Sequence, residues 1–129
     1  SRQIINDIDG TVVGDVNNTN TTTGVLKVDK LNRTWTELIT SVTAEAGSHY
    51  IVDTSVTGGV TITLPATAQL GDEIRVIDGF GTASQFNIII SRNGHNIQGR
   101  ADDLTIQTDR AAFGLVYYNA EQGWILTEN

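Results

Sequence analysis

Short segments of β-type residues, separated by turn residues, recur from Tyr50 to the C-terminus. Apolar and polar residues alternate in Val60–Leu64 and in Glu73–Ile77, which is typical of strands with one buried face. Glycine, proline and asparagine stand between the segments, and Asn93-Gly94 is a strong turn signal. This spacing predicts an all-β sandwich or barrel rather than alternating strands and helices. The predicted strands are Tyr50–Val52, Val60–Leu64, Glu73–Ile77, Phe86–Ile90, Leu104–Ile106, Phe113–Tyr118 and Trp124–Leu126.

One segment, Ile88–Ile90, has three consecutive apolar residues and does not alternate. Such a run indicates a strand that is buried on both faces. One face can pack on the domain's own core. The other face has two possible partners, a second layer of the same chain or a neighbouring protomer, and the residues leave both open.

The first 46 residues have a different character. Residues 17–24 form a polar tract of Asn, Thr and Gly, which predicts a loop or linker. The apolar clusters on either side of it are too small to form a core, so they would pack on the main domain or on another copy of the chain. We therefore divide the chain into an N-terminal neck region, 1–46, and a β-sandwich domain, 47–129.

A helix-like spacing of apolar residues spans the end of this neck region and predicts a partly helical segment. Thr36 and Thr40 lie within the pattern and disfavour a helix. The alternative is therefore an irregular β segment that covers one end of the barrel. The residues with this spacing are Leu31, Trp35, Leu38, Ile39 and Val42.

Composition excludes several classes of protein. The chain has 129 residues and no cysteine, so it has the length of one domain and no disulfide, cysteine nucleophile or thiolate zinc site. Eight basic residues against fifteen acidic ones, a net charge of −7, disfavour nucleic acid as a partner. No apolar stretch is long enough to span a membrane. Methionine is also absent, from which we expect the sequence to be a piece of a longer chain.

No catalytic motif is recognisable, so we predict that the protein is not an enzyme and has no cofactor or metal. His49 and His95 are isolated in the sequence, without the further ligands that a metal site needs. Asp102 and Asp103 are adjacent, and neighbouring residues of a strand point to opposite faces. A glycan-degrading or metal-dependent enzyme acting through these two carboxylates is the least favoured hypothesis.

Taken in order, the motifs from Tyr50 onward resemble a module of tailed-bacteriophage fibres, over a little more than half of the chain. The closing aromatic pair, Tyr117 and Gly123-Trp124, is part of this resemblance. The other matching motifs are Tyr50-Ile-Val-Asp-Thr, Val60-Thr-Ile-Thr-Leu-Pro65, Gly71-Asp-Glu-Ile, Val76-Ile-Asp78, Asn87-Ile-Ile-Ile, Arg92-Asn-Gly-His-Asn-Ile97, Gly99 and Asp103-Leu-Thr.

This resemblance implies a fold and a function. Such domains are the tips, or knobs, of tail fibres or tail needles, and they form trimeric jelly rolls that resemble tumour necrosis factor. We therefore expect a structural virion protein, assembled in the host cytoplasm as a homotrimer. Its tip would contact a glycan or another outer-membrane component of the host during adsorption or genome ejection.

The main alternative is a carbohydrate-binding module of a fibre or of a secreted bacterial protein. It predicts an exposed aromatic residue beside polar loops, and Tyr118 is the candidate for sugar stacking. Under the fibre hypothesis, a trimer axis could bring together three copies of an arginine and form an anion pocket. The candidates for a receptor or axis contact are therefore Tyr118, Arg92, Arg100 and Arg110.

Overall fold

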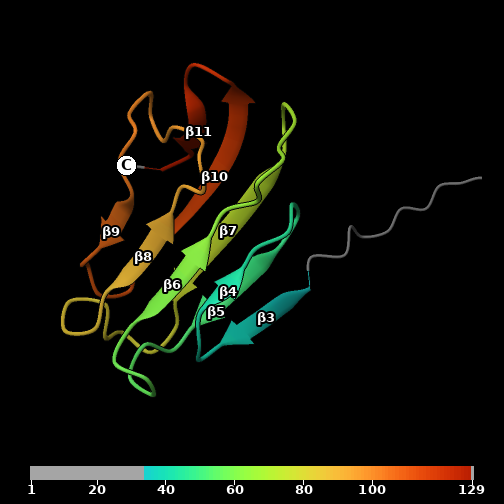
Figure 1. Ribbon diagram of the computed structural model, residues 1–129. Coiled ribbons are helices and arrows are strands. Elements are labelled where there is room, and N and C mark those ends of the chain that lie inside the picture. Colours follow the sequence, from blue (N-terminus) through green and yellow to red (C-terminus); the bar gives the residue numbers. More distant parts are fainter. Residues whose placement is uncertain (1–33, 129) are drawn as a thin grey trace, which may run out of the picture. The chain divides into compact units, whose positions relative to one another are not determined.

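The computed structural model describes residues 34–128, which form two β-sheets and no helix (Figure 1). The five-stranded sheet has the order β11-β10-β7-β5-β3, and the four-stranded sheet has the order β4-β6-β8-β9. The prediction of an all-β fold is confirmed for this part of the chain. The strands are β3 (Trp35–Leu38), β4 (Val42–Thr43), β5 (His49–Val52), β6 (Val60–Thr63), β7 (Glu73–Asp78), β8 (Ile88–Ser91), β9 (Leu104–Ile106), β10 (Ala112–Asn119) and β11 (Gly123–Leu126).

From β3 to β8 the chain crosses to the other sheet after every strand. Each return to a sheet therefore starts at the same end, so β3, β5 and β7 are parallel, and so are β4, β6 and β8. The stacked passes resemble successive turns of a solenoid. The last three strands add antiparallel pairs, in which β9 joins β8, β10 joins β7, and β11 joins β10.

The jelly-roll connectivity is not confirmed. Jelly rolls are built from Greek keys, whose strands are antiparallel, whereas most of the strand pairs here are parallel. Alternation along a strand shows which side chains are buried but does not identify the neighbouring strand. The same strand segments could therefore belong to either topology.

The helix predicted across the end of the neck region is wrong for the described residues. Trp35–Leu38 is a strand that pairs in parallel with β5, and a bend leads from it into β4. Leu38 is buried whereas Trp35 is exposed, so the apolar residues do not share one face. Threonines and pairing with β5 outweigh the helical spacing, and the alternative of a β segment describes this stretch better.

The compact unit that contains both sheets begins at Thr34. Residues 34–46, which we assigned to the neck, therefore contribute β3 and β4 to the sandwich. The rest of the predicted neck, 1–33, lies outside the described residues. Within the described part, no helix is long and apolar enough to cross a membrane.

The core lies between the two sheets, because alternate side chains of each strand point inward. In β7 every second residue is buried, and in β6 Val60 and Ile62 are buried. Trp124 is fully buried. Tyr117 and Tyr118, which are neighbours in β10, point to opposite sides, with Tyr117 buried and Tyr118 exposed. This alternation leaves two outer faces, one on each sheet.

Candidate functional site

The outer face of the five-stranded sheet is largely apolar. Its outward side chains alternate with buried ones, and strand register sets Ile51 beside Ile77 and Ile77 beside Ala112. Trp35 and Ile51 are exposed at 38% and 39% of their surface. We call this surface the apolar face. Its outward residues are Trp35, Glu37, His49, Ile51, Glu73, Arg75, Ile77, Ala112, Gly114, Val116 and Ile125.

His49 lies within the apolar face but is almost completely buried. The indole ring of Trp35 packs edge-on against its imidazole, with ring centroids 5.0 Å apart. The Nδ1 atom of His49 has no hydrogen-bond partner among the described residues. This histidine therefore serves mainly as a flat packing surface for Trp35.

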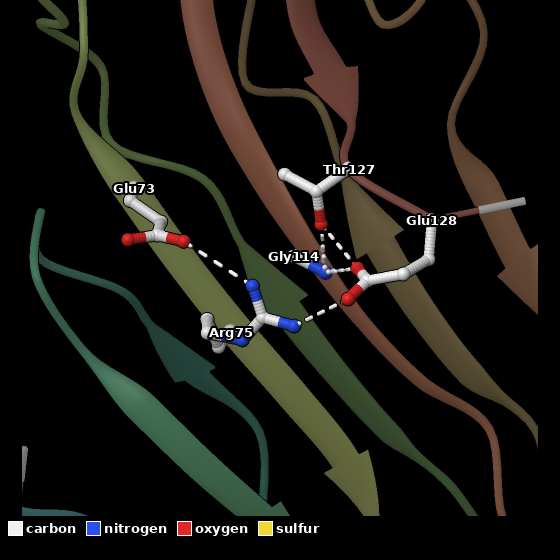
Figure 2. A network of polar contacts seen from close by, with 5 residues as sticks. All are labelled: Glu73, Arg75, Gly114, Thr127 and Glu128. Carbon is white, nitrogen blue, oxygen red and sulfur yellow. Dashed lines mark hydrogen bonds and ion pairs between the residues drawn. The ribbon is translucent and has the colours of Figure 1, made fainter.

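Arg75 is the one basic residue on the apolar face, and its charge is balanced there. Its guanidinium donates to Glu73 over 3.3 Å and to Glu128 over 2.7 Å (Figure 2). A β-carbon at residue 114 would lie 2.7 Å from Arg75 Nη1, so Gly114 provides the space in which the guanidinium crosses β10. These bonds raise the pKa of Arg75, and the hydrogen bond that it donates to Glu128 is the largest cause.

Glu128 is held on several sides. Its carboxylate accepts hydrogen bonds from the Thr127 hydroxyl, from Arg75 and from the backbone N–H of Gly114 (Figure 2). The Thr127 hydroxyl, followed by Arg75, lowers the pKa of Glu128. Glu128 is therefore ionised and fixed in position at neutral pH.

The outer face of the four-stranded sheet is hydroxyl-rich. Register places Thr61 beside Ile89 and Ile89 beside Thr105, and in the next row it places Thr63 beside Ser91. Ile89 is the only large apolar side chain in these rows and is 36% exposed. Its exposure contradicts burial on both faces of Ile88–Ile90 within the single chain. We call this surface the threonine face.

The three candidate arginines do not lie in one group. Arg92 donates from Nη1 to the carbonyl of His95, within the turn that follows β8. Arg100 is exposed in the same loop, before β9, whereas Arg110 lies beyond the other end of β9. Arg110 donates from Nη1 to the carbonyl of Gly79 over 2.6 Å. Arg92 and Arg110 thus have structural contacts within the chain, and Arg100 and Arg110 are both exposed.

Tyr118, the candidate for sugar stacking, is 55% exposed at the end of β10. The register of β10 and β11 shifts between Tyr117 and Asn119, which places Tyr118 at a β-bulge. Its inner neighbour Tyr117 packs between the rings of His95 and Trp124. The bulge therefore separates an exposed aromatic side chain from a buried aromatic cluster.

Sequence reasoning missed Asp78, which is fully buried at the end of β7. Its carboxylate accepts hydrogen bonds from the backbone N–H groups of Gly81, Thr82, Ala83 and Arg110, at 3.0 to 3.4 Å. Burial by itself would raise the pKa of this group, but the four N–H donors together lower it. In the sequence, Asp78-Gly79 resembles an ordinary solvated turn, so only its position at a strand end was informative.

No group of three or more His, Asp or Glu side chains in the described residues is placed to hold a metal ion. His95 Nε2 lies 2.8 Å from the carbonyl of Ala66, and His49 packs on Trp35. Asp103 accepts from the backbone N–H of Arg92, so it stabilises a turn. The isolated histidines and the aspartate pair therefore have local packing and turn contacts.

No protein-family model matches the chain, and no curated protein matches it in sequence.

Proposed function

We propose that this chain is the distal tip of a homotrimeric bacteriophage tail fibre or tail needle. It is a structural component of the virion, assembled in the host cytoplasm, and it contacts the host cell envelope during adsorption or genome ejection. The order of motifs from Tyr50 to Trp124 supports the proposal at the level of sequence. At the level of structure, the apolar face supports it.

The apolar face is the structural observation that best supports a homotrimer. Trp35 and Ile51 expose more than a third of their surface on the same sheet, and Ile77, Val116 and Ile125 are half-buried. Contiguous apolar surface of this kind marks an interaction site more often than scattered residues do. Three copies that turn this face toward a common axis would cover it, while the threonine face would remain in solvent.

The charge of Arg75 on the apolar face is compatible with such burial, whereas Glu37, at the edge strand β3, would have to stay in contact with water. An unpaired charge is costly to remove from water, whereas a paired and hydrogen-bonded one is tolerated. Arg75 is bonded to both Glu73 and Glu128 within its own chain. A neighbouring protomer can therefore cover the guanidinium without having to supply a counter-ion.

Light scattering after size-exclusion chromatography tests the assembly. We expect a mass three times the 13.9 kDa of the chain. A stable monomer at micromolar concentration would contradict the homotrimer. Binding of the fluorescently labelled protein to a panel of bacterial cells tests the host contact, and we expect saturable binding to some strains. A trimer that binds none of a broad panel would argue against an adsorption role.

A further inference from the structure

A cavity of about 310 Å³ opens on the side of the sandwich where the sheets end in β9 and β11. The chain between β9 and β10 crosses from one sheet to the other there and forms one wall. This volume is at the lower end of the range for pockets that bind small molecules, about 300–1,000 Å³. Its lining residues are Thr105, Ile106, Gln107, Thr108, Ala111, Ala112, Phe113, Leu126 and Glu128.

The cavity combines an apolar interior with polar groups at the exposed positions. Ile106, Phe113 and Leu126 are buried or half-buried and provide the apolar part. Thr105, Gln107 and Thr108 are exposed, and Gln107 and Thr108 bring an amide and a hydroxyl group, whereas the side chain of Thr105 lies on the threonine face. The side chains of these three residues form no hydrogen bond with another residue of 34–128. Glu128 adds a carboxylate.

Both walls are fixed by contacts outside the cavity. On one side, the Asp78 carboxylate accepts a hydrogen bond from the backbone N–H of Arg110. The backbone N–H of Asp78 donates to the carbonyl of Ala111 over 2.8 Å. On the other side, Arg75 and the N–H of Gly114 hold Glu128. A pocket whose walls are already ordered loses little conformational entropy when a ligand binds. The cavity is thus pre-formed.

Its charge excludes anionic ligands. Glu128 is the only charged residue that lines the cavity, and it is ionised at neutral pH because Thr127 and Arg75 lower its pKa. Eleven of the fifteen acidic residues lie between 34 and 128, against four of the eight basic residues. This part of the chain therefore carries the whole net charge of −7. Phosphorylated or carboxylated ligands would be repelled.

We propose that this cavity binds one neutral pyranose ring of a host-surface glycan. A pyranose has an apolar C–H face that can pack against Phe113 and Leu126. Its hydroxyl groups can both donate and accept hydrogen bonds at Gln107, Thr108 and Glu128. An alkylamine would use only Glu128, whose carboxylate already accepts hydrogen bonds from Arg75, Thr127 and Gly114, and would leave the other polar groups unpaired. The inference rests on the proposed function, since it names the host component that the tip would contact.

The test is an NMR titration of the full chain with methyl glycosides of glucose, galactose, rhamnose and N-acetylglucosamine, and with N-acetylneuraminic acid as the anionic probe. We expect at least one neutral glycoside to shift the methyl signals of Ile106 and Leu126, and the anionic sugar to leave them unchanged. Gln107→Ala should weaken that binding at least tenfold. Gln85→Ala is the matched control, because Gln85 is also an exposed glutamine but does not line the cavity.

The inference would be overturned if no neutral glycoside shifts the methyl signals of the cavity. It would also be overturned if the two glutamine variants bind the glycoside with equal affinity. Preferential binding of the anionic sugar would also overturn it. The mass of the assembly separates this result from the proposed function. A trimer that adheres to cells but binds no sugar in the cavity refutes only the sugar site. A monomer that binds the sugar refutes only the fibre tip.

Discussion

On the five-stranded sheet most outward positions hold apolar residues, with Glu37, His49, Glu73 and Arg75 among them, whereas on the four-stranded sheet they hold mainly threonine and serine. Both sheets contribute alternate side chains to the same core. Strand alternation therefore dictates which positions are outward, but the residue type at those positions decides what the surface can do. The difference favours a protein neighbour for the apolar face and solvent for the threonine face.

Two isoleucines show the difference most directly. Ile51 on the apolar face and Ile89 on the threonine face are exposed to nearly the same extent, 39% and 36%. Ile51 lies between Glu37 and Ile77, whereas Ile89 lies between Thr61 and Thr105. A single exposed isoleucine among threonines is ordinary on a protein surface, but adjoining apolar side chains form a patch that another surface can cover.

The largest expected effect comes from placing a charge at each of these positions. Ile51→Glu should convert the trimer into a monomer, because it introduces an unpaired carboxylate into the covered face. Ile89→Glu should leave the trimer intact. Light scattering measures both masses, and circular dichroism checks that each variant is folded. If both variants remain trimeric, or if Ile89→Glu alone dissociates, the assignment of the two faces is wrong.

A second pair of variants tests whether the sheets are fixed to each other, as a stable difference between the faces requires. Gly123 begins β11 at a φ of 71°, and a β-carbon there would overlap the backbone carbonyl of Asn96, in the segment that follows β8. Gly94 has a φ of 91° and no atom within 4 Å of that position. Both glycines therefore adopt a left-handed conformation, but only one of them is in close contact.

Gly123→Ala should lower the free energy of unfolding by about 2–5 kcal/mol, from left-handed strain of about 1–2 kcal/mol and overpacking of about 1–3 kcal/mol. Gly94→Ala should incur only the first of these costs, about 1–2 kcal/mol. Urea denaturation at fixed protein concentration measures both. Equal losses would show that Asn96 moves away freely and that this junction between the sheets is loose.

The third prediction separates interior stability from assembly. Asp78→Asn should lower the free energy of unfolding by about 2–3 kcal/mol, because a charged acceptor of four backbone N–H groups becomes neutral. Once folded, the variant should still form the trimer, since Asp78 points inward from the five-stranded sheet and not toward the apolar face. A folded but monomeric variant would show that the loop after β7 takes part in assembly.

The same carboxylate gives a pH dependence with a defined sign. Its pKa is lowered in the folded protein, so its contribution to stability is fully present above the unfolded value, about 3.9. That contribution is lost as the pH falls through the lower, folded-state pKa. The stability gap between the native chain and Asp78→Asn should therefore narrow below pH 4. A gap that stays constant down to pH 2 would contradict the lowered pKa.

The strands from Tyr50 onward were predictable because alternation of buried and exposed residues is written directly into the sequence. Val60–Thr63 and Glu73–Asp78 follow their predicted segments almost residue for residue. Parallel pairing was not predictable, because each strand's partner depends on where the intervening chain returns. Trp35–Leu38 was missed because its pairing with β5 outweighs a helix-like spacing.

The surfaces were less predictable than the strands. Among the candidate residues, Tyr118 is exposed as expected, but Arg92 and Arg110 bond to backbone carbonyls of nearby turns. Asp78 and Arg110 are 32 residues apart in the sequence. Nothing in the sequence around either residue indicates that the Asp78 carboxylate accepts a hydrogen bond from the backbone N–H of Arg110. The Glu128–Arg75 pair is likewise formed by tertiary structure. Contacts of this kind depend on the strand order, which the sequence pattern did not give.

The smallest expected effect concerns how the charges on the apolar face are balanced. Arg75→Gln should raise the pKa of Glu128, because the guanidinium is one of the groups that lower it. The pKa should nevertheless remain below its ordinary value, since the Thr127 hydroxyl and the Gly114 N–H still donate to the carboxylate. Thr127→Val should raise it further than Arg75→Gln does, because the hydroxyl is the larger cause.

NMR titration of the Glu128 side-chain carbonyl carbon measures this order, with Asp78 as the internal control because it is bonded to other donors on the inner side of the sheet. If Arg75→Gln leaves the Glu128 titration unchanged, the guanidinium does not neutralise that carboxylate. The apolar face would then present a charge without a partner, and a neighbouring protomer would have to supply one. The contrast with the threonine face would be weaker, because both faces would then present unpaired polar groups to their surroundings.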